Sequence, residues 1–226
     1  MKTSRIIFIS FFSFLGLILL SLMVMGFMYK DKDIRKFKEK DIKTVNITLD
    51  SFSHIVVSDN CRVNLSSNTS YSVSYSLLKG TVNKPVYNIN NDTLFIKSTK
   101  TNFTSSINVK ANNIISVSGV NCKITLDKFK QEALSFDVKK TEIRFYKNVN
   151  IQNLDITLSE SSWLNGWSSF KAQNLKLNTS NSKFQGSING KLKSFDANIT
   201  KNSEVRLLKA LHYNLNVDSS SSVKLY

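Results

Sequence analysis

The sequence has few of the residues on which enzyme chemistry commonly depends. Among 226 residues there are two histidines, two cysteines and one proline. His54 and His212 are far apart and have no spacing typical of a zinc site. The chain also lacks a phosphate-binding loop, a dinucleotide motif and a nucleophile elbow. We therefore predict no catalytic residues, no metal site and no cofactor.

Acidic residues are scarce relative to basic ones. The chain has 31 basic and 16 acidic side chains, and residues 44–226 hold 22 and 12 of them, a net charge of +10. Such a surface suits anionic partners, but we favour the simpler interpretation that the lysines lie on solvated strand faces. Because no nucleic-acid-binding motif accompanies the charge, we predict no nucleic-acid partner.

Charge is absent from one long N-terminal segment, Ile6–Tyr29, which spans 24 residues. A helix of that length crosses a hydrocarbon core of about 30 Å. The segment is longer than the apolar region of a cleaved signal peptide and lacks an Ala-x-Ala site. We predict that residues 1–29 form one N-terminal transmembrane helix, an uncleaved anchor with the membrane as its partner. A cleaved signal peptide is the alternative.

The next segment, residues 30–44, reads as a charged linker, with seven basic and four acidic side chains over residues 30–43. By the positive-inside rule these basic residues place the C-terminal side in the cytoplasm. Lys2 and Arg5 before the apolar run instead fit export. We predict an exported domain in the periplasm of a bacterial cell envelope, with the inverted topology as the alternative.

The most regular feature is a repeat of about 20 residues in the C-terminal half. Two apolar columns mark it, and a small polar residue follows the second column in each repeat. The first column contains Ile115, Leu134, Leu154, Leu175, Phe195 and Leu215; the second contains Val117, Phe136, Ile156, Leu177, Ala197 and Val217; the polar residues are Ser118, Asp137, Thr157, Asn178, Asn198 and Asp218. The i, i+2 spacing is a strand period, and fixed-period similarity indicates a stacked repeat.

These patterns predict an all-β domain, a parallel β-helix or β-solenoid with about 20 residues per turn. Residues 115–226 are its regular repeats, with both apolar columns facing inward. Residues 45–114 read as short strands between turn signals and lack the strict period. We expect this irregular part to contribute rungs or hairpins that cap one end of the stack.

Four residues of the repeats are candidates for ligand contact. Trp163 and Trp167 flank a short segment in the third repeat, where aromatic rings either stack on a sugar or cover the edge of the core. Asp155 and Asp196 occupy one column and would approach each other on stacked turns. Outward polar residues are expected on strands in any case, so both interpretations stay open for these four residues.

Cys61 and Cys122 both alternate with apolar neighbours, so both are predicted to point inward. They are too few and too widely spaced for a structural zinc site. Two buried free thiols and one disulfide are the alternatives.

Two stretches resemble a known family. Residues 51–65, SFSHIVVSDNCRVNL, resemble the opening of the GIN domain, and residues 114–126, IISVSGVNCKITL, resemble its central strand–Ser-Gly–strand motif. The later repeats resemble its Leu-x-Ile/Val-x-x-Ser units. The family is that of head domains of putative auto-transporter adhesins, and the resemblance covers residues 46–226. It implies a β-helical fold and an envelope location, and it supplies no catalytic residues. The retained anchor and a stretch poor in glycine before Cys122 depart from the family pattern.

Taken with the missing catalytic residues, the sequence predicts a non-enzymatic, membrane-anchored envelope protein with an adhesive, scaffolding or ligand-binding role. Its expected partners are envelope polysaccharide or another envelope protein. The alternative is a β-helical protein that binds or degrades polysaccharide.

Overall fold

The computed structural model describes residues 2–30, 42–78, 85–97, 106–146, 148–188, 192–207 and 210–226, and the side chains of these except residues 2–10, 26–30, 167–169 and 188. The chain divides into two compact units, Met1–Asp41 and Ile42–Tyr226. The first contains helix α1 (Lys2–Lys30). No helix within the described residues is long and apolar enough to cross a membrane. The predicted transmembrane span is therefore not confirmed, and most of the predicted linker lies outside the described residues.

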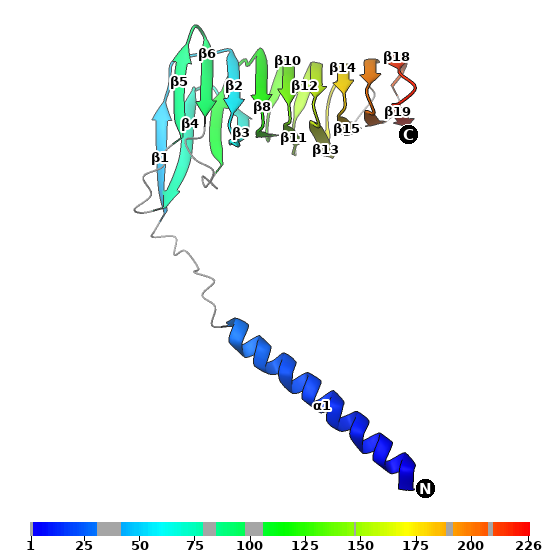
Figure 1. The fold of residues 1–226 in the computed structure, drawn as a ribbon. Coiled ribbons are helices and arrows are strands. Elements are labelled where there is room, and N and C mark those ends of the chain that lie inside the picture. The colour runs from blue at the N-terminus through cyan, green and yellow to red at the C-terminus, as the bar shows by residue number, and fades with distance from the viewer. Residues whose placement is uncertain are drawn as a thin grey trace. The chain divides into compact units, whose positions relative to one another are not determined.

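The second unit consists of two β-sheets (Figure 1). In spatial order, sheet A contains β1 (Ile42–Thr48), β4 (Ser72–Leu78), β7 (Ile107–Ala111), β3 (Arg62–Ser67), β9 (Lys123–Leu126), β11 (Glu142–Phe145), β13 (Trp163–Phe170), β15 (Lys183–Ile188), β17 (Glu204–Leu207) and β19 (Ser222–Leu225). Sheet B contains β18 (His212–Val217), β16 (Ser194–Thr200), β14 (Asn174–Ser180), β12 (Asn150–Ser159), β10 (Lys130–Lys139), β8 (Ser116–Val120), β2 (His54–Ser58), β6 (Thr93–Lys97) and β5 (Val86–Asn90).

From β8 onward the chain alternates between the sheets, one strand in B and the next in A. Each strand pairs in parallel with the strand two further along the sequence. This confirms an all-β solenoid of about five turns with about 20 residues per turn. The repeat forms this structure because no single turn has enough apolar surface for a core, whereas stacked turns bury a continuous one.

The core lies between the sheets. Leu154, Ile156 and Leu158 alternate along β12 and are at most 2% exposed. Aromatic rings link the two sheets at the centre, where Phe136 of β10 contacts Phe145 of β11 with ring centroids 6.0 Å apart. Burying a large apolar side chain stabilises the fold by about 1.5–3 kcal/mol, so these columns account for much of the stability.

Both ends of the predicted columns need correction. Ile115 is 53% exposed, because it precedes β8 and its neighbour Ile114, 1% exposed, takes the inward place. In the last turn the register moves by two residues: Leu215 pairs with Ala197 rather than with Phe195, whose partner is Tyr213. Val217 is therefore in a third column and 38% exposed, since β18 has a neighbour on one side only. Asn216, not Asp218, continues the outward polar column.

The irregular part extends the same two sheets. Strands β2 and β3 stack on β8 and β9, and β6 and β7 stack on β2 and β3, all in parallel. The second pair in sequence is thus placed outside the first, so the spatial order of these turns is reversed relative to the chain. Strands β1, β4 and β5 pair antiparallel at this end. β5 and β6 form a hairpin, whereas β1 and β4 are separated in the chain by β2 and β3.

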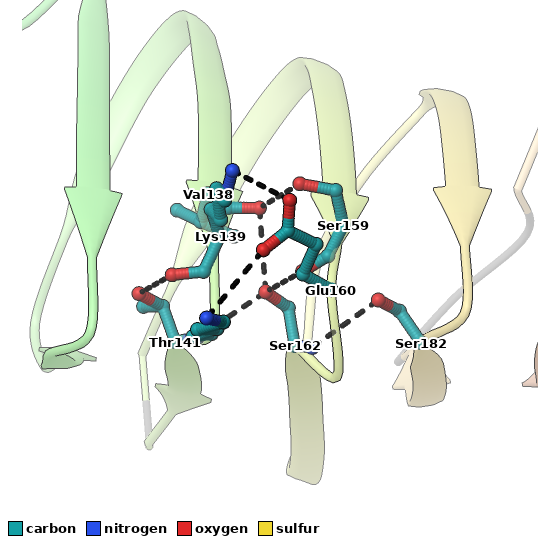
Figure 2. Close-up of polar contacts among 8 residues, drawn as sticks. Val138, Lys139, Thr141, Ser159, Glu160, Ser162 and Ser182 are labelled. Atoms are coloured by element: carbon teal, nitrogen blue, oxygen red, sulfur yellow. Dashed lines mark hydrogen bonds and ion pairs between the residues drawn. The ribbon is translucent and has the colours of Figure 1, made fainter.

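The corner at which the chain leaves sheet B for sheet A has the same construction in the four turns from β10 to β17. A residue with positive φ, such as Lys140, Glu160 or Asn181, allows a tight turn. The next inward residues are small and hydroxylated, and Thr141, Ser162, Ser182 and Ser203 are at most 3% exposed. The backbone N–H of each donates to the hydroxyl of the next turn: Thr141 to Ser162 at 3.2 Å, and Ser162 to Ser182 at 3.2 Å (Figure 2). We call this column the corner ladder.

The corner ladder also bonds within each turn. The Ser162 hydroxyl donates to the Ser159 carbonyl at 2.6 Å, and the exposed Glu160 carboxylate above it lies 2.5 Å from Lys139 Nζ (Figure 2). Unpaired polar groups at a buried turn would be costly, so small hydroxyls that satisfy the backbone explain why each corner tolerates burial.

Candidate ligand-binding site

A groove of about 510 Å³ lies on the outer face of sheet B. Strands β10, β12, β14 and β16 each contribute to it, so it crosses four consecutive turns. Its polar lining comprises Asn113, Glu132, Ser135, Asn153, Asp155, Asn174, Lys176, Ser194 and Asp196.

The groove lies where the alternation of inward and outward side chains along the strands is interrupted. In β10, Glu132 and Ala133 are both exposed before the inward Leu134, and Gln152 and Asn153 repeat this before Leu154. The pairing of β10 with β12 likewise skips from Gln131–Ile151 to Ala133–Asn153. The same interruption occurs at matching positions of β10 and β12. The groove therefore continues from one strand to the next.

One polar column of the groove is held by side-chain hydrogen bonds between turns. Asn153, Asn174 and Ser194 are register partners on successive strands. The Asn174 amide donates to the Asn153 side-chain oxygen at 2.8 Å, and the Ser194 hydroxyl donates to the Asn174 oxygen at 2.9 Å. Stacked amides of this kind fix one another's orientation, so the column presents ordered groups.

A second column carries the charges. Ser135, Asp155, Lys176 and Asp196 are register partners in turn. Lys176 Nζ lies 3.6 Å from Asp155 Oδ2, and the two side chains are 63% and 46% exposed. Exposed pairs contribute at most about 1 kcal/mol to stability, so this arrangement costs little to rearrange around a ligand. With Glu132, the groove has three carboxylates and one lysine on a basic protein.

His54 and Ser116 continue the charged column beyond the groove. Ser116 is the register partner of both Ser135 and His54. The His54 Nδ1 and Ser116 Oγ atoms are 2.7 Å apart, a hydrogen bond whose donor depends on the histidine tautomer. Sequence reasoning missed this contact, because the two residues are 62 positions apart and meet only through the reordered turns. Among the described residues, no carboxylate is hydrogen-bonded to His54 or to Ser116, so the two do not form part of a catalytic triad.

Trp163 lies elsewhere, on the outer face of sheet A. It pairs with Glu142 and Lys183 and is 37% exposed. A smaller pocket of about 200 Å³ adjoins it, formed with Lys183, Phe184, Gln185, Glu204 and Arg206. The structure thus brings Asp155 and Asp196 into one groove and keeps Trp163 out of it. The side chain of Trp167 lies outside the described residues.

Ion pairs organise the face around Trp163. Glu204 lies 2.5 Å from Arg206 and 3.7 Å from Lys183, and Glu142 pairs with Arg144 and with Lys123. The hydrogen bond from Arg206 lowers the pKa of Glu204. Burial alone would raise the pKa of Glu142, but hydrogen bonds from Arg144 and Lys123 outweigh it and lower the pKa. Both acids are therefore ionised, and their charges are already matched within the sheet.

Metal binding has no support in the described part of the chain, where no group of three or more His, Cys, Asp or Glu side chains is arranged to hold an ion. Cys61 and Cys122 are buried, as predicted, and both thiols are free. The groups that line the groove and can contact a ligand are amides, hydroxyls, carboxylates and one lysine.

Comparison with known proteins places the fold. No family model and no curated protein matches the sequence. A putative adhesin from Bacteroides fragilis NCTC 9343 has a similar structure, with a TM-score of 0.52 and 11% identity over 83% of this chain and 98% of that chain. A putative adhesin from Parabacteroides merdae ATCC 43184 (TM-score 0.49, 12% identity, 83% and 97% covered) and a putative lipid binding protein from Parabacteroides distasonis ATCC 8503 (0.46, 13%, 83% and 98%) are also similar. At these identities the likeness establishes the fold alone.

Proposed function

We propose that this protein is a non-enzymatic adhesive or ligand-binding protein of the cell envelope, and that a linear glycan lies along the sheet B groove. The observation that carries the proposal is the groove itself, in which four consecutive turns present polar side chains in register. An extended ligand that runs across the strands meets a new pair of polar groups at each step of about 4.8 Å.

The composition of the groove indicates the ligand's chemistry. Amides and hydroxyls suit the hydroxyl groups of sugars, while three carboxylates against one lysine disfavour anionic polymers and favour neutral or amine-bearing ones. The similarity in fold to a putative adhesin supports an adhesive role. The resemblance of residues 51–65 and 114–126 to the GIN domain supports the same role and an extracytoplasmic location.

A glycan array probed with the purified chain at low and high salt tests this function. We expect binding to neutral or amine-bearing glycans that persists in salt at least for the neutral ones, because hydrogen bonds are screened less than surface charge. Binding only to anionic glycans, lost in high salt, would instead reflect the net charge of +10 and would contradict the proposal.

Membrane anchoring through Ile6–Tyr29, with residues 44–226 in the periplasm, completes the proposal. The uncharged length of this segment supports it. Protease added to spheroplasts is expected to remove the β-domain from membrane-bound protein. A protected domain with an accessible N-terminus would establish the inverted topology.

One observation favours a second function, degradation of a polysaccharide. Asp155 and Asp196 line one groove two strands apart, which separates their backbones by about 9.6 Å, near the upper end of the separation of about 6.5–9.5 Å between the carboxyl groups of inverting glycosidases. Turnover of a bound glycan that is abolished by Asp155→Asn or by Asp196→Asn would establish this function in place of the first. We expect no turnover.

A further inference from the structure

The two cysteines are consecutive members of the corner ladder. Cys61 and Cys122 directly precede β3 and β9, whose first residues, Arg62 and Lys123, are register partners. The next member is Thr141, whose hydroxyl accepts from the Cys122 N–H at 3.4 Å and lies 3.5 Å from the Cys122 sulfur. At two neighbouring turns, therefore, thiols stand where later turns have hydroxyls.

Backbone hydrogen bonds on either side fix the spacing of the two cysteines. The Asn60 N–H donates to the Asn121 carbonyl at 2.7 Å, and the Lys123 N–H donates to the Cys61 carbonyl at 2.8 Å. The two Cα atoms are thus one strand spacing apart, about 4.8 Å, which lies within the range of about 4.4–6.8 Å found for disulfides. Both side chains point inward and are 1% and 8% exposed.

The surroundings of the sulfurs argue against a nucleophilic role. Burial and, to a smaller extent, the neighbouring Cys122 and Asp59 raise the pKa of the Cys61 thiol to about 12. Burial also raises the pKa of Cys122, to about 11. Neither thiol is a thiolate at neutral pH, so neither serves as a nucleophile. A side chain at Gly119 would clash, because its Cβ would lie 2.9 Å from the Cys122 sulfur, so the sulfur fills the space that the glycine leaves.

A disulfide between Cys61 and Cys122 would close an unusually long loop of the chain. In the regular repeats, neighbouring turns are about 20 residues apart, whereas Cys61 and Cys122 are 61 positions apart. The intervening segment contains β3 to β8 and includes the turn that is stacked out of chain order. A covalent link here closes a loop about three times as long as a regular turn, and the loss of chain entropy in the unfolded state grows with loop length.

We infer that Cys61 and Cys122 form an intrachain disulfide that locks the reordered turns, when the chain folds in the presence of a small-molecule disulfide. Two thiols are oxidised to one disulfide while one molecule of oxidised glutathione is reduced to two of glutathione, and exchange passes through a mixed disulfide. Because the folded thiols are buried and protonated, the exchange takes place before the turns close or when they open.

The test starts from the full chain purified under reducing conditions. It is incubated with oxidised and reduced glutathione at urea concentrations up to the unfolding midpoint, and free thiols are then alkylated in denaturant. We expect a monomer on a non-reducing gel, a mass 2 Da below that of the reduced chain, and no alkylation of either cysteine. The oxidised chain should melt about 10 °C higher than the reduced chain.

The matched control is the double variant Cys61→Ser/Cys122→Ser, which places at both turns the serine that later turns carry. It is expected to fold and to melt at the same temperature with and without reductant. Two alkylated cysteines in the wild-type chain after incubation, glutathione bound to either cysteine as the final product, or a disulfide-linked dimer would each overturn the inference.

Discussion

The two sheets share one core but present different chemistry on their outer faces. The strands of sheet A carry eight basic and two acidic residues, whereas those of sheet B carry four of each. Sheet A also has the exposed Trp163, and sheet B has the groove with Asp155 and Asp196. The net charge of +10 is therefore not a uniform property of the domain, and the sheet with less positive charge is the one with the larger concave site.

This contrast follows from the alternation of strands. β12 and β13 are neighbours in sequence, yet the corner between them sends one to each sheet. Asp155 and Trp163 are eight residues apart and lie on different outer faces, while Asp155 and Asp196 are 41 apart and share a groove. In a solenoid of this kind, residues one full turn apart share a site, and residues half a turn apart do not.

The largest effect is expected from a substitution in the core between the two sheets, because it destabilises both of them. Ile156 is fully buried between Phe136 and Leu177 on the neighbouring strands. Ile156→Asp should unfold the β-domain, with a loss of more than about 4 kcal/mol, because an unpaired charge is buried. Circular dichroism melts report the change. The control, Lys176→Ala on the outer face, should stay within about 0.5 kcal/mol, and equal melting of the two variants would refute the inward register.

A smaller effect compares the middle of the stack with its last turn. Leu177 and Leu215 occupy the same column, but Leu177 is fully buried and Leu215 only partly. Leu177→Ala should cost about 3–4 kcal/mol in urea unfolding, and Leu215→Ala about 1 kcal/mol, since the end of the stack can relax around the lost atoms. Similar losses of stability in the two variants would mean that Leu215 is buried to the same extent as Leu177.

The corner ladder joins the two faces, and its hydroxyls can be removed one at a time. Ser162 is 1% exposed, accepts from the Thr141 N–H and donates to the Ser159 carbonyl. Ser162→Ala should cost about 1–2 kcal/mol, because it leaves a buried N–H unpaired. The exposed Ser187→Ala, measured by the same urea titration, should change stability by less than about 0.5 kcal/mol. A neutral Ser162→Ala would show that the ladder does not stabilise the corners.

The last corner adds a pH-dependent contact. The Asp218 carboxylate accepts the Lys201 N–H at 2.6 Å, and this bond, with hydrogen bonds from Ser221 and Ser220, lowers its pKa to about 2. A lowered pKa means that the stabilisation is complete above the unfolded value near 4 and is lost as the pH falls through about 2. The melting temperature of Asp218→Asn should therefore lie below that of the wild type at pH 7, with the gap closing at pH 2. A gap that is constant with pH would contradict this.

The repeat made much of the fold predictable. Twelve apolar residues at a strand period identified the stacked turns, and nine of them lie in the inward columns at the predicted register. The exceptions are Ile115, which precedes β8 and is exposed, and Leu215 and Val217 in the last turn, where no following strand enforces the register. The reordering of β2/β3 and β6/β7 was not predictable, because each pair reads as an ordinary turn and only the packed structure determines which stacks on which.

The site was predictable in part, and for the same reason. Asp155 and Asp196 were grouped correctly because one column of a repeat stays in one column of the stack. The groove itself was not foreseen, since it depends on the break in alternation at Glu132–Ala133 and Gln152–Asn153. A polar residue two positions before an inward leucine, Glu132 before Leu134 and Gln152 before Leu154, was the available signal, because strand alternation would place an inward residue there. The buried hydroxyls of the corner ladder were not predicted.

The most direct test of the account measures the affinity of a glycan identified on the array for the full chain and four variants. We predict that Asp155→Asn and Asp196→Asn weaken binding at least about tenfold, because each removes a charged hydrogen-bonding group from the groove. Asp137→Asn, on the same face but outside the groove, and Trp163→Ala, on the other sheet, should bind like the wild type. Loss of binding in Trp163→Ala with full binding in both groove variants would contradict the account and place the ligand on sheet A.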